Sequence, residues 1–597
     1  MVFYDFEVFK KDWLVVILDM DNQKEHVIIN NPEEIEQFHQ EHEGDIWVGF
    51  NNVHYDQYIL KAILCGFDPK EVNDFIILED HAGWQFSPLF KEIKMINYDV
   101  MLRTDRGLKT FEGFLGNNIK ETTVPFDIPR KLTPEEIEET VKYCRHDVEQ
   151  TVEVFIKRID EFNTMMYFIK HFHYPLDFLS KTKAQLTATI LGGNRKGASF
   201  NDEFDFQILP CVELKKYRFI ADWYMKEENH TYTKSQENVM VAGVPHTFSW
   251  GGGHGAIVQY HDTGVFLIAD VTAYYPSMQA KYKFGYRVMD NPENFEFIHN
   301  SNIEYKRKGD KKARLPFKIM DNAISGQMKQ KSSALYDPMS NNSICVNGQM
   351  LLLDLIEHLE GIADLIQNNT DGILLKIRDY ERDFDRIDDI VYEWEKRTGM
   401  QMEFETFFGE IFQKDVNNYL LVDHETGAVK SKGEYLKKLS ALDYDLPIVN
   451  RAVVEYMTKG VPVQKTIMEC DDLMEFQMVR KISSLYRQIL HGGYYRDVKE
   501  INPATGRLKT FKRFIGQRKV VNERCVRVFA SSKDSDGGLW KVKGLDKIEK
   551  LEGTPEHAFI WNDAVKGVKC PEYLDKNWYI KTAQDRLAKF GVQTERR

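Results

Sequence analysis

Short apolar runs that end at carboxylates are the most informative pattern along the chain. The first residues alternate between apolar and polar side chains, which predicts a strand whose period of two places Asp5 and Glu7 on one face. A second run, residues 265–269, is entirely apolar and leads directly into Asp270. Like charges on one strand face repel each other unless a cation lies between them, so the first pair is unusual for a packed core.

A turn is predicted at residues 369–372, where Asn-Thr-Asp-Gly separates two short apolar segments. Asn, Asp and Gly tolerate positive φ, so this composition favours a hairpin with Asp371 at its tip. A strand end with Asp270 beside a hairpin tip with Asp371 could hold two divalent metal ions for phosphoryl transfer. Taken alone, the turn needs no such role, because hairpin chemistry also explains it.

A long helix is predicted after Thr133, where Thr-Pro-Glu-Glu forms a capping box with proline in the first turn. Within this helix Tyr143 and Asp147 are four residues apart and therefore share a face. The apolar positions that follow the cap are Ile137, Val141, Cys144, Val148 and Val152. This spacing places a tyrosine and a carboxylate side by side on the helix.

The length of 597 residues predicts roughly three to five domains. Seven scattered cysteines without a C-x-x-C pair argue against a zinc site and against a secreted disulfide framework. No apolar stretch approaches the roughly 20 residues of a membrane helix, and the N-terminus is not a signal peptide. These observations predict a soluble protein of a reducing cytoplasm with no membrane partner.

The formal net charge of −13 is unexpected for a protein that binds nucleic acid. The acids, however, crowd into segments such as 33–36 and 135–139, whereas bases cluster within 306–314 and 507–519. Local basic stripes determine phosphate binding more directly than the total charge does. Either stripe could also be an ordinary solvated face.

Two of these segments resemble motifs of the family B DNA polymerases. Residues 270–277, Asp-Val-Thr-Ala-Tyr-Tyr-Pro-Ser, are similar to motif A, and residues 369–372 are similar to motif C. A proline after an aromatic pair is also a common helix start, so each motif alone has an ordinary structural explanation. Their ordered occurrence along one chain favours the resemblance, which implies that Asp270 and Asp371 bind the catalytic metal ions.

The N-terminal segments resemble the three motifs of DnaQ-like 3′–5′ exonucleases. These motifs are D-x-E at residues 5–7, N-x-x-x-(F/Y)-D ending at Asp56, and Y-x-x-x-D from Tyr143 to Asp147. The resemblance implies that Asp5, Glu7, Asp56 and Asp147 hold two Mg²⁺ or Mn²⁺ ions. Tyr143 would then orient the attacking water. Asp99 is a further acid in this region, and we expect it to cap a helix.

Residues 318–326 resemble motif B, the fingers helix of the same family. The resemblance implies that Lys318 meets the incoming triphosphate and that Asn322 and Gly326 lie at the nascent base pair. Lys306 and Arg314 precede the motif at spacings suited to further triphosphate contacts, and converging cations stabilise phosphoryl transfer. A surface helix rich in lysine is the alternative.

Further segments resemble nucleic-acid contacts of phage family B enzymes. Trp250, Gly251 and Gly252 lie in a segment similar to the Y-x-G-G linker that contacts the template strand, and a flexible glycine loop is an equally weighted alternative. Tyr419 lies in a segment similar to the K-x-Y palm motif, with Asn417 in place of the lysine. The candidate for the following K-x-K-G loop supplies Lys430 and Lys432. Tyr275 of motif A would lie under the sugar and exclude a 2′-hydroxyl.

The expected fold is multidomain α/β and α+β, with an RNase H-like exonuclease domain followed by a right-hand palm, fingers and thumb polymerase. The expected segments are 1–170 exonuclease, 171–264 connecting region and start of palm, 265–300 palm, 301–348 fingers, 349–438 palm, and 439–597 thumb. We expect the last segment to be largely helical with basic stripes that hold duplex DNA.

The resemblance implies a bacteriophage-type DNA polymerase with proofreading, which acts on primer–template DNA and dNTPs in the cytoplasm of a bacterial host. Replisome proteins are further candidate partners. A terminal protein is not expected, because the gaps between the motifs are too short for the insertions that protein-primed phage polymerases carry there. Only 48 positions separate Asp270 from Lys318, and 45 separate Gly326 from Asp371.

Two departures from the family pattern keep other functions open. Ser325 stands where motif B has tyrosine, and Asn369 replaces the first aspartate of motif C. One alternative is a 3′–5′ exonuclease whose polymerase-like half only holds DNA. A second is a non-enzymatic single-strand DNA-binding replication protein, which would have no need of six metal-binding carboxylates.

Overall fold

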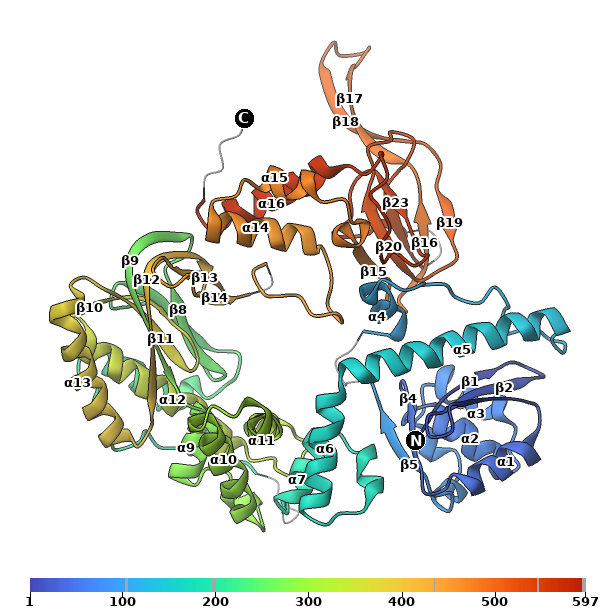
Figure 1. Cartoon of the computed structure of the whole chain (residues 1–597). Coiled ribbons are helices and arrows are strands. Elements are labelled where there is room, and N and C mark those ends of the chain that lie inside the picture. Colours follow the sequence, from blue (N-terminus) through green and yellow to red (C-terminus); the bar gives the residue numbers. More distant parts are fainter. Residues whose placement is uncertain (102–105, 196–199, 434, 545–546, 593–597) are drawn as a thin grey trace.

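The computed structural model describes residues 1–101, 106–195, 200–433, 435–544 and 547–592. In the view of Figure 1, four groups of elements follow one another around a ring: an N-terminal sheet with its helices, a group of helices, a large sheet and a C-terminal group. None of the described helices combines the length and the apolar composition that a membrane span requires.

The N-terminal module is a five-stranded sheet in the order β3-β2-β1-β4-β5. The strand β1 pairs antiparallel with β2 and parallel with β4, and β4 pairs parallel with β5. The strands are β1 (Val2–Val8), β2 (Trp13–Asp19), β3 (Lys24–Ile29), β4 (Ile46–Gly49) and β5 (Ile96–Asp99). The helices are α1 (Pro32–Glu41), α2 (Asp56–Leu64), α3 (Pro69–Ile77), α4 (Leu108–Leu115) and α5 (Pro134–Lys157).

Two expectations for this module concern the capping box at Thr133 and the role of Asp99. The capping box is present at α5, where the Thr133 hydroxyl accepts from Glu136 N–H and the Glu136 carboxylate accepts from Thr133 N–H. Asp99, in contrast, is not a helix cap. It ends β5, and its carboxylate accepts the backbone N–H groups of Asn51 and Met101, so it fixes the turns beside the strand.

A helical group connects the N-terminal module to the large sheet. Its members are α6 (Ile159–His171), α7 (Lys183–Ile190), α9 (Tyr274–Tyr282), α10 (Pro292–Arg307) and α11 (Lys311–Ser325). Phe317 of α11 packs edge-on against Phe168 of α6 and face-on against Tyr305 of α10. One continuous apolar core therefore joins α10 and α11 to the N-terminal module.

The large sheet has nine strands in the order β14-β13-β12-β9-β11-β10-β8-β7-β6, and every neighbouring pair is antiparallel. Its first strands are β6 (Ser235–Val241), β7 (Val244–Ser249), β8 (Gly252–Ala256) and β9 (Tyr260–Val271). The others are β10 (Ala363–Asn368), β11 (Gly372–Ile377), β12 (Met402–Asp415), β13 (Asn418–Asp423) and β14 (Val429–Lys432). The expected connecting region and the two expected palm segments thus contribute strands to one sheet.

Among the described residues, the helices that pack on this sheet lie on one of its faces. The helices α12 (Pro338–Leu359) and α13 (Tyr380–Thr398) pack on the β9 residues Leu267, Ala269 and Val271, and the short helix α8 (Arg218–Tyr224) joins the same core. Because side chains alternate along a strand, Asp270 lies on the opposite face with Phe266 and Ile268. The carboxylate is therefore kept away from the helix-covered core.

The expectation of a helical C-terminal segment is wrong. The segment begins and ends with helices, α14 (Pro447–Lys459), α15 (Val463–Glu469) and α16 (Lys576–Ala588), but strands dominate between them. These strands are β15 (Met478–Lys481), β16 (Tyr486–His491), β17 (Tyr494–Ile501), β18 (Leu508–Ile515), β19 (Lys519–Val521), β20 (Cys525–Ala530), β21 (Leu539–Lys543), β22 (Lys547–Lys550) and β23 (Ala558–Ile560).

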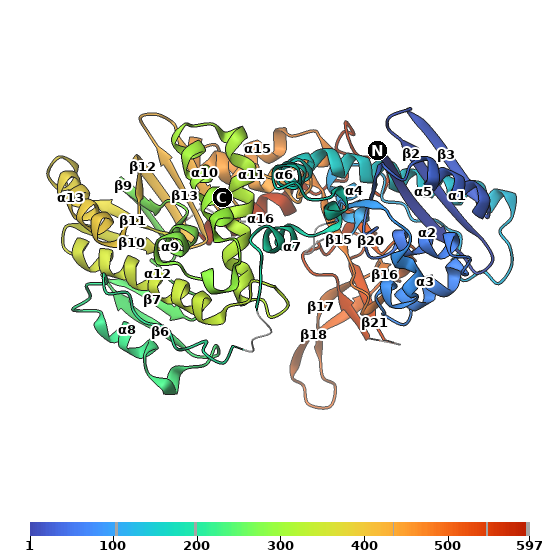
Figure 2. The same cartoon turned by 90° about the horizontal axis from the view of Figure 1, so that it is seen from below.

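The basic residues within 507–519 occupy this β structure. The hairpin β17–β18 projects from the C-terminal group, as both views show (Figures 1 and 2). Long-range pairing between strands, rather than a helical period, organises these side chains.

Candidate active sites

Four carboxylates meet beside strand β1. Asp5 and Glu7 project from β1, Asp56 begins α2, and Asp147 lies on α5. Glu7, Asp56 and Asp147 are buried. Burial raises the pKa of Asp56 to about 7, and it raises the pKa of Asp147 to about 6 although Lys109 opposes this shift.

Mutual repulsion adds to this effect. The pKa of Asp5 is raised first by burial and then by Asp56, Glu7 and Asp147, and the pKa of Glu7 is raised by burial, Asp147 and Asp56. A group of buried carboxylates that oppose one another's ionisation is stabilised by cations. The structure therefore brings together all four acids that the sequence predicted.

The donor set fits a hard divalent cation. Carboxylate oxygens are the ligands that Mg²⁺ and Mn²⁺ prefer. Donor atoms of Asp5, Glu7 and Cys144 lie within 4.8 Å of one another, but the Cys144 thiol donates to the Asp5 backbone oxygen at 3.2 Å. Burial also raises the pKa of Cys144, so its sulfur stays protonated and only the carboxylates remain as ligands.

Tyr143 lies at this cluster, as expected. Its pKa is raised by burial and then by Asp147, Glu7 and Asp5, so the phenol stays protonated and can donate a hydrogen bond. The ring of Tyr143 also lines a surface pocket together with His146, Asn118 and Arg145. The tyrosine thus stands between the buried acids and the surface.

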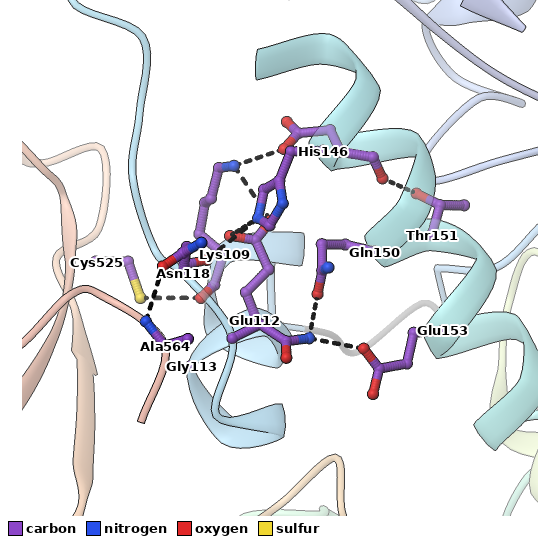
Figure 3. A network of polar contacts seen from close by, with 12 residues as sticks. Lys109, Glu112, Gly113, Asn118, His146, Gln150, Thr151, Glu153, Cys525 and Ala564 are labelled. Carbon is purple, nitrogen blue, oxygen red and sulfur yellow. Dashed lines mark hydrogen bonds and ion pairs between the residues drawn. The ribbon is translucent and has the colours of Figure 1, made fainter. Parts of the chain in front are cut away.

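Sequence reasoning missed Lys109 and Glu112 on helix α4. The Lys109 ammonium lies 2.6 Å from Asp147 Oδ1 and 3.1 Å from Glu112 Oε1, and it lies 4.5 Å from the centroid of the Tyr143 ring. Glu112 is fully buried, and His146 Nε2 approaches its second oxygen at 3.7 Å (Figure 3). Burial opposes the charge on Lys109, but Asp147 and Glu112 raise its pKa above the usual range.

The second site lies at the end of β9. Gly372, the first residue of β11, is the strand partner of Asp270, and the backbone N–H of Val271 donates to Asp371 O at 2.8 Å. Asp371 therefore occupies the turn beside Asp270, as the sequence predicted. Burial and then Asp371 raise the pKa of Asp270, while Lys430 opposes the shift.

Two glutamates on β12 were not expected at this site. Glu403 is the strand partner of Asp270, and its carboxylate accepts from Thr272 Oγ1 at 2.6 Å and pairs with Lys306 at 2.5 Å. Burial alone would raise the pKa of Glu403, but Lys306, Thr272 and Arg314 bring it below its usual value. Two of the predicted triphosphate contacts, Lys306 and Arg314, thus lie beside the Asp270 strand.

Lys430 lies between Asp270 and Glu405, the second of the two β12 glutamates. Its ammonium lies 2.6 Å from Glu405 and 3.5 Å from Asp270. Lys432 is the strand partner of Tyr419, whose pKa is raised by burial and, less strongly, by Asp270 and Asp371. Tyr419, Lys430 and Lys432 therefore all approach the uncovered face of the sheet near Asp270, although Tyr419 itself is buried.

The remaining motif B residues lie on one face of α11. Lys318, Asn322 and Gly326 are four residues apart and exposed, in line with the half-buried Arg314 one turn earlier. Arg314 Nε donates to Asn302 Oδ1 at 2.9 Å. This arrangement leaves a polar helical face beside the sheet.

Tyr275, on α9, packs against helix α12 and lies near Asp371. Burial raises its pKa, as do Cys345 and, less strongly, Asp371. A Cβ at Gly348 would lie 3.2 Å from the Tyr275 ring, so the ring is packed tightly against α12.

The glycine segment divides into a buried and an exposed part. Trp250 is 2% exposed, packs among aromatic side chains that include Tyr224 and Phe204, and donates from Nε1 to Asn229 O at 3.2 Å. Its side chain is therefore not on the surface. Gly251 is exposed and Gly252 half-buried, so only the glycine backbone remains available for the expected template contact.

Comparisons with known proteins add little. No protein-family model and no curated protein matches the chain. A solved structure of the family B DNA polymerase from the hyperthermophilic archaeon Pyrobaculum calidifontis is similar with a TM-score of 0.39 and 13% identity, over 99% of this chain and 78% of that chain. A likeness at this level supports no conclusion about activity.

Proposed function

We propose that the protein is a template-directed DNA polymerase of the family B type with a 3′–5′ proofreading exonuclease. The observation that carries the proposal is the presence of two separate carboxylate sites on two separate sheets. Asp270 and Asp371 meet beside the cations Lys306 and Arg314, while the four N-terminal acids lie in another module.

At both sites, bound Mg²⁺ or Mn²⁺ would supply the positive charge that activates the attacking oxygen and stabilises the leaving group. Asp270 and Asp371 would hold two ions at the polymerase site, and the fit is supported by their oxygen donors and by the repulsion between them. Asp5, Glu7, Asp56 and Asp147 would hold two ions at the exonuclease site.

At the polymerase site the chain's own side chains would bind and orient primer–template DNA and dNTPs. Lys306, Arg314 and Lys318 would bind the triphosphate, and in doing so Lys306 would leave Glu403. Tyr275 would pack under the sugar and exclude a 2′-hydroxyl. Asn322 and Gly326 would line the nascent base pair.

Contacts with the DNA strands would come from two parts of the large sheet, the strands β13 and β14 and the turn between β7 and β8. Tyr419, Lys430 and Lys432 would bind the primer strand, and the backbone of Gly251 and Gly252 would approach the template. At the exonuclease site Tyr143 would orient the attacking water by donating a hydrogen bond from its phenolic O–H. Lys109 would hold Asp147 in place.

The finer assignments belong to the same proposal. We assign residues 1–170 to the exonuclease, 301–348 to the fingers, 439–597 to the thumb, and the sheet between them to the palm. The enzyme would be of bacteriophage type, act in the bacterial host cytoplasm alongside replisome proteins, and extend an ordinary nucleic-acid primer without a terminal protein. Covalent attachment of dNMP to a partner protein would contradict this last point.

Primer extension tests the proposal. Wild-type protein with Mg²⁺ should lengthen a labelled primer when dNTPs are present and shorten it when they are absent. Asp371→Asn should abolish only lengthening, and the double variant Asp5→Ala with Glu7→Ala should abolish only shortening. Loss of both activities in either variant would contradict two independent sites.

One observation favours a second candidate, a 3′–5′ exonuclease whose polymerase-like half only holds DNA. The hairpin tip offers Asn369 in place of a second carboxylate, and Lys430 pairs with Asp270. Shortening without lengthening in wild-type protein would favour this candidate. A protein with neither activity would fit the single-strand DNA-binding alternative.

A further inference from the structure

Helix α4 carries Lys109 to the exonuclease acids, but the C-terminal module holds this helix. Gly113 lies so close to strand β15 that a Cβ there would be 2.7 Å from Val479 Cγ1. At the start of α4, the Cys525 thiol on β20 donates to Lys109 O at 3.5 Å (Figure 3). Residues 366 and 416 positions apart in the sequence thus meet at α4.

The centre of this contact is Arg527 on β20, whose side chain is fully buried. Its Nη2 group donates to the backbone oxygens of Gly113 at 3.0 Å and Asn117 at 2.7 Å. Its Nε donates to Gln477 Oε1 at 3.0 Å, and Gln477 in turn donates to Phe114 O at 3.1 Å. The carbonyl groups in the last turn of a helix lack N–H partners within the helix. Arg527 supplies a hydrogen-bond donor to one of these groups, Gly113 O.

Asn117 continues the contact to the helix that carries Asp147. Its amide nitrogen donates to Gln150 Oε1 and to Glu153 Oε2, both at 2.6 Å, and both acceptors lie on α5 (Figure 3). Near the N-terminal end of α4, Lys109 donates a hydrogen bond directly to Asp147. Arg527 therefore contacts α4 directly and is connected through Asn117 to α5, the helix that carries Asp147.

We infer that Arg527 is a positioning residue of the exonuclease site, which acts by fixing α4 so that Lys109 stays beside Asp147. The inference rests on the proposed exonuclease. It means that the site is completed by the C-terminal module, although none of the predicted catalytic residues comes from that module. A salt bridge cannot account for the burial of Arg527, because the contacts described for its side chain are with backbone oxygens and an amide.

The test compares Arg527→Met with Arg524→Met in the full chain. Arg524 is a matched control, because its side chain also donates to several backbone oxygens, those of Ser483, Tyr486 and Arg487, but these lie within the C-terminal module. Loss of residues that orient a site typically lowers activity by about 10–100-fold. We expect a loss of this size in exonuclease turnover for Arg527→Met, an unchanged rate of primer extension, and neither effect for Arg524→Met.

Two further readouts separate positioning from general support of the fold. Hydrogen–deuterium exchange should become faster in residues 108–115 in Arg527→Met. The double variant with Lys109→Met should lose no more exonuclease activity than Lys109→Met alone. Equal losses of extension and exonuclease, additive losses in the double variant, or unchanged exchange in 108–115 would each overturn the inference.

The remaining outcomes are also decisive. If Arg527→Met does not fold, Gln477→Leu removes one of the bonds to α4 and should show the same pattern at smaller size; normal exonuclease activity and exchange in that variant would overturn the inference. If wild-type protein has no exonuclease activity, the proposed function fails. The exchange of residues 108–115 then still decides whether Arg527 holds α4.

Discussion

The close approach of Gly372 to Asp270 makes Gly372→Ala the most informative single change at the proposed polymerase site. A Cβ at this position would lie 2.1 Å from Asp270 Oδ1 and 2.7 Å from Ala269 O, whereas ordinary contacts begin at 3.4 Å. Gly372 does not have a left-handed φ, so alanine fits the backbone and the effect is steric. The Asp270 carboxylate and the neighbouring β9 backbone at Ala269 must therefore move.

The size of the effect follows from this displacement. Relieving the overlap requires a shift of more than about 1 Å, and a misplacement of that size in an active site can lower the rate by roughly 100-fold. This corresponds to about 2.7 kcal/mol in the activation free energy. Steady-state primer extension under excess dNTP measures it, and exonuclease activity on single-stranded DNA serves as an internal control for folding.

A second alanine substitution provides a matched control. Gly44→Ala would place a Cβ with no atom within 4 Å, again without a left-handed φ, and should change neither activity. If Gly372→Ala extends primers at the wild-type rate, Asp270 is not the group whose position limits polymerisation. If it loses the exonuclease equally, the substitution acts through the fold and the steric argument fails.

Four further predictions address the two sites. Lys109→Met should lower exonuclease turnover by about 10–100-fold, because Asp147 loses its partner, while primer extension stays unchanged. The pKa of Asp56 is raised to about 7 in the folded protein. Between the ordinary pKa of an aspartate and pH 7, the folded protein therefore binds more protons than the unfolded chain. The stability of metal-free protein should fall as the pH rises through this window. Thermal unfolding in EDTA should show this fall, and Asp56→Asn or added Mg²⁺ should reduce it; a melting temperature independent of pH would contradict the assignment. Tyr275→Val should raise ribonucleotide incorporation, measured as the ratio of dNTP to rNTP efficiency, and an unchanged ratio would refute the sugar contact. Asp371→Asn should remove polymerisation almost entirely, whereas Asn369→Asp should change the rate only modestly; equal loss in both would make residue 369 a metal ligand.

Sequence patterns located the carboxylates because each lies within or directly beside a locally defined element. The alternation in β1 placed Asp5 and Glu7 on one face, and the capping box at Thr133 fixed the helix that carries Asp147. The hairpin composition likewise fixed the turn at Asp371. In these cases neighbouring residues determine the local structure, and the carboxylate follows from it.

The missing residues depend on contacts between distant segments. Glu403 reaches Asp270 only because β12 pairs with β9 in one particular register, and nothing near residue 403 indicates that pairing. Lys109 reaches Asp147 from α4, and this helix contacts the distant C-terminal module through Arg527. The C-terminal segment itself was expected to be helical because its charges were considered without the cross-strand partners that organise β17 and β18.

Under the proposed function, one chain holds two separate sites, one that removes the 3′-terminal nucleotide and one that adds nucleotides. A primer with a mismatched, labelled 3′ end probes both sites in a single reaction with Mg²⁺ and dNTPs. Wild-type protein should excise the mismatch and then extend the primer. Asp5→Ala with Glu7→Ala should retain the mismatch, and Asp371→Asn should excise without extending. Excision that persists in the first variant, or extension that persists in the second, would contradict the assignment of the sites.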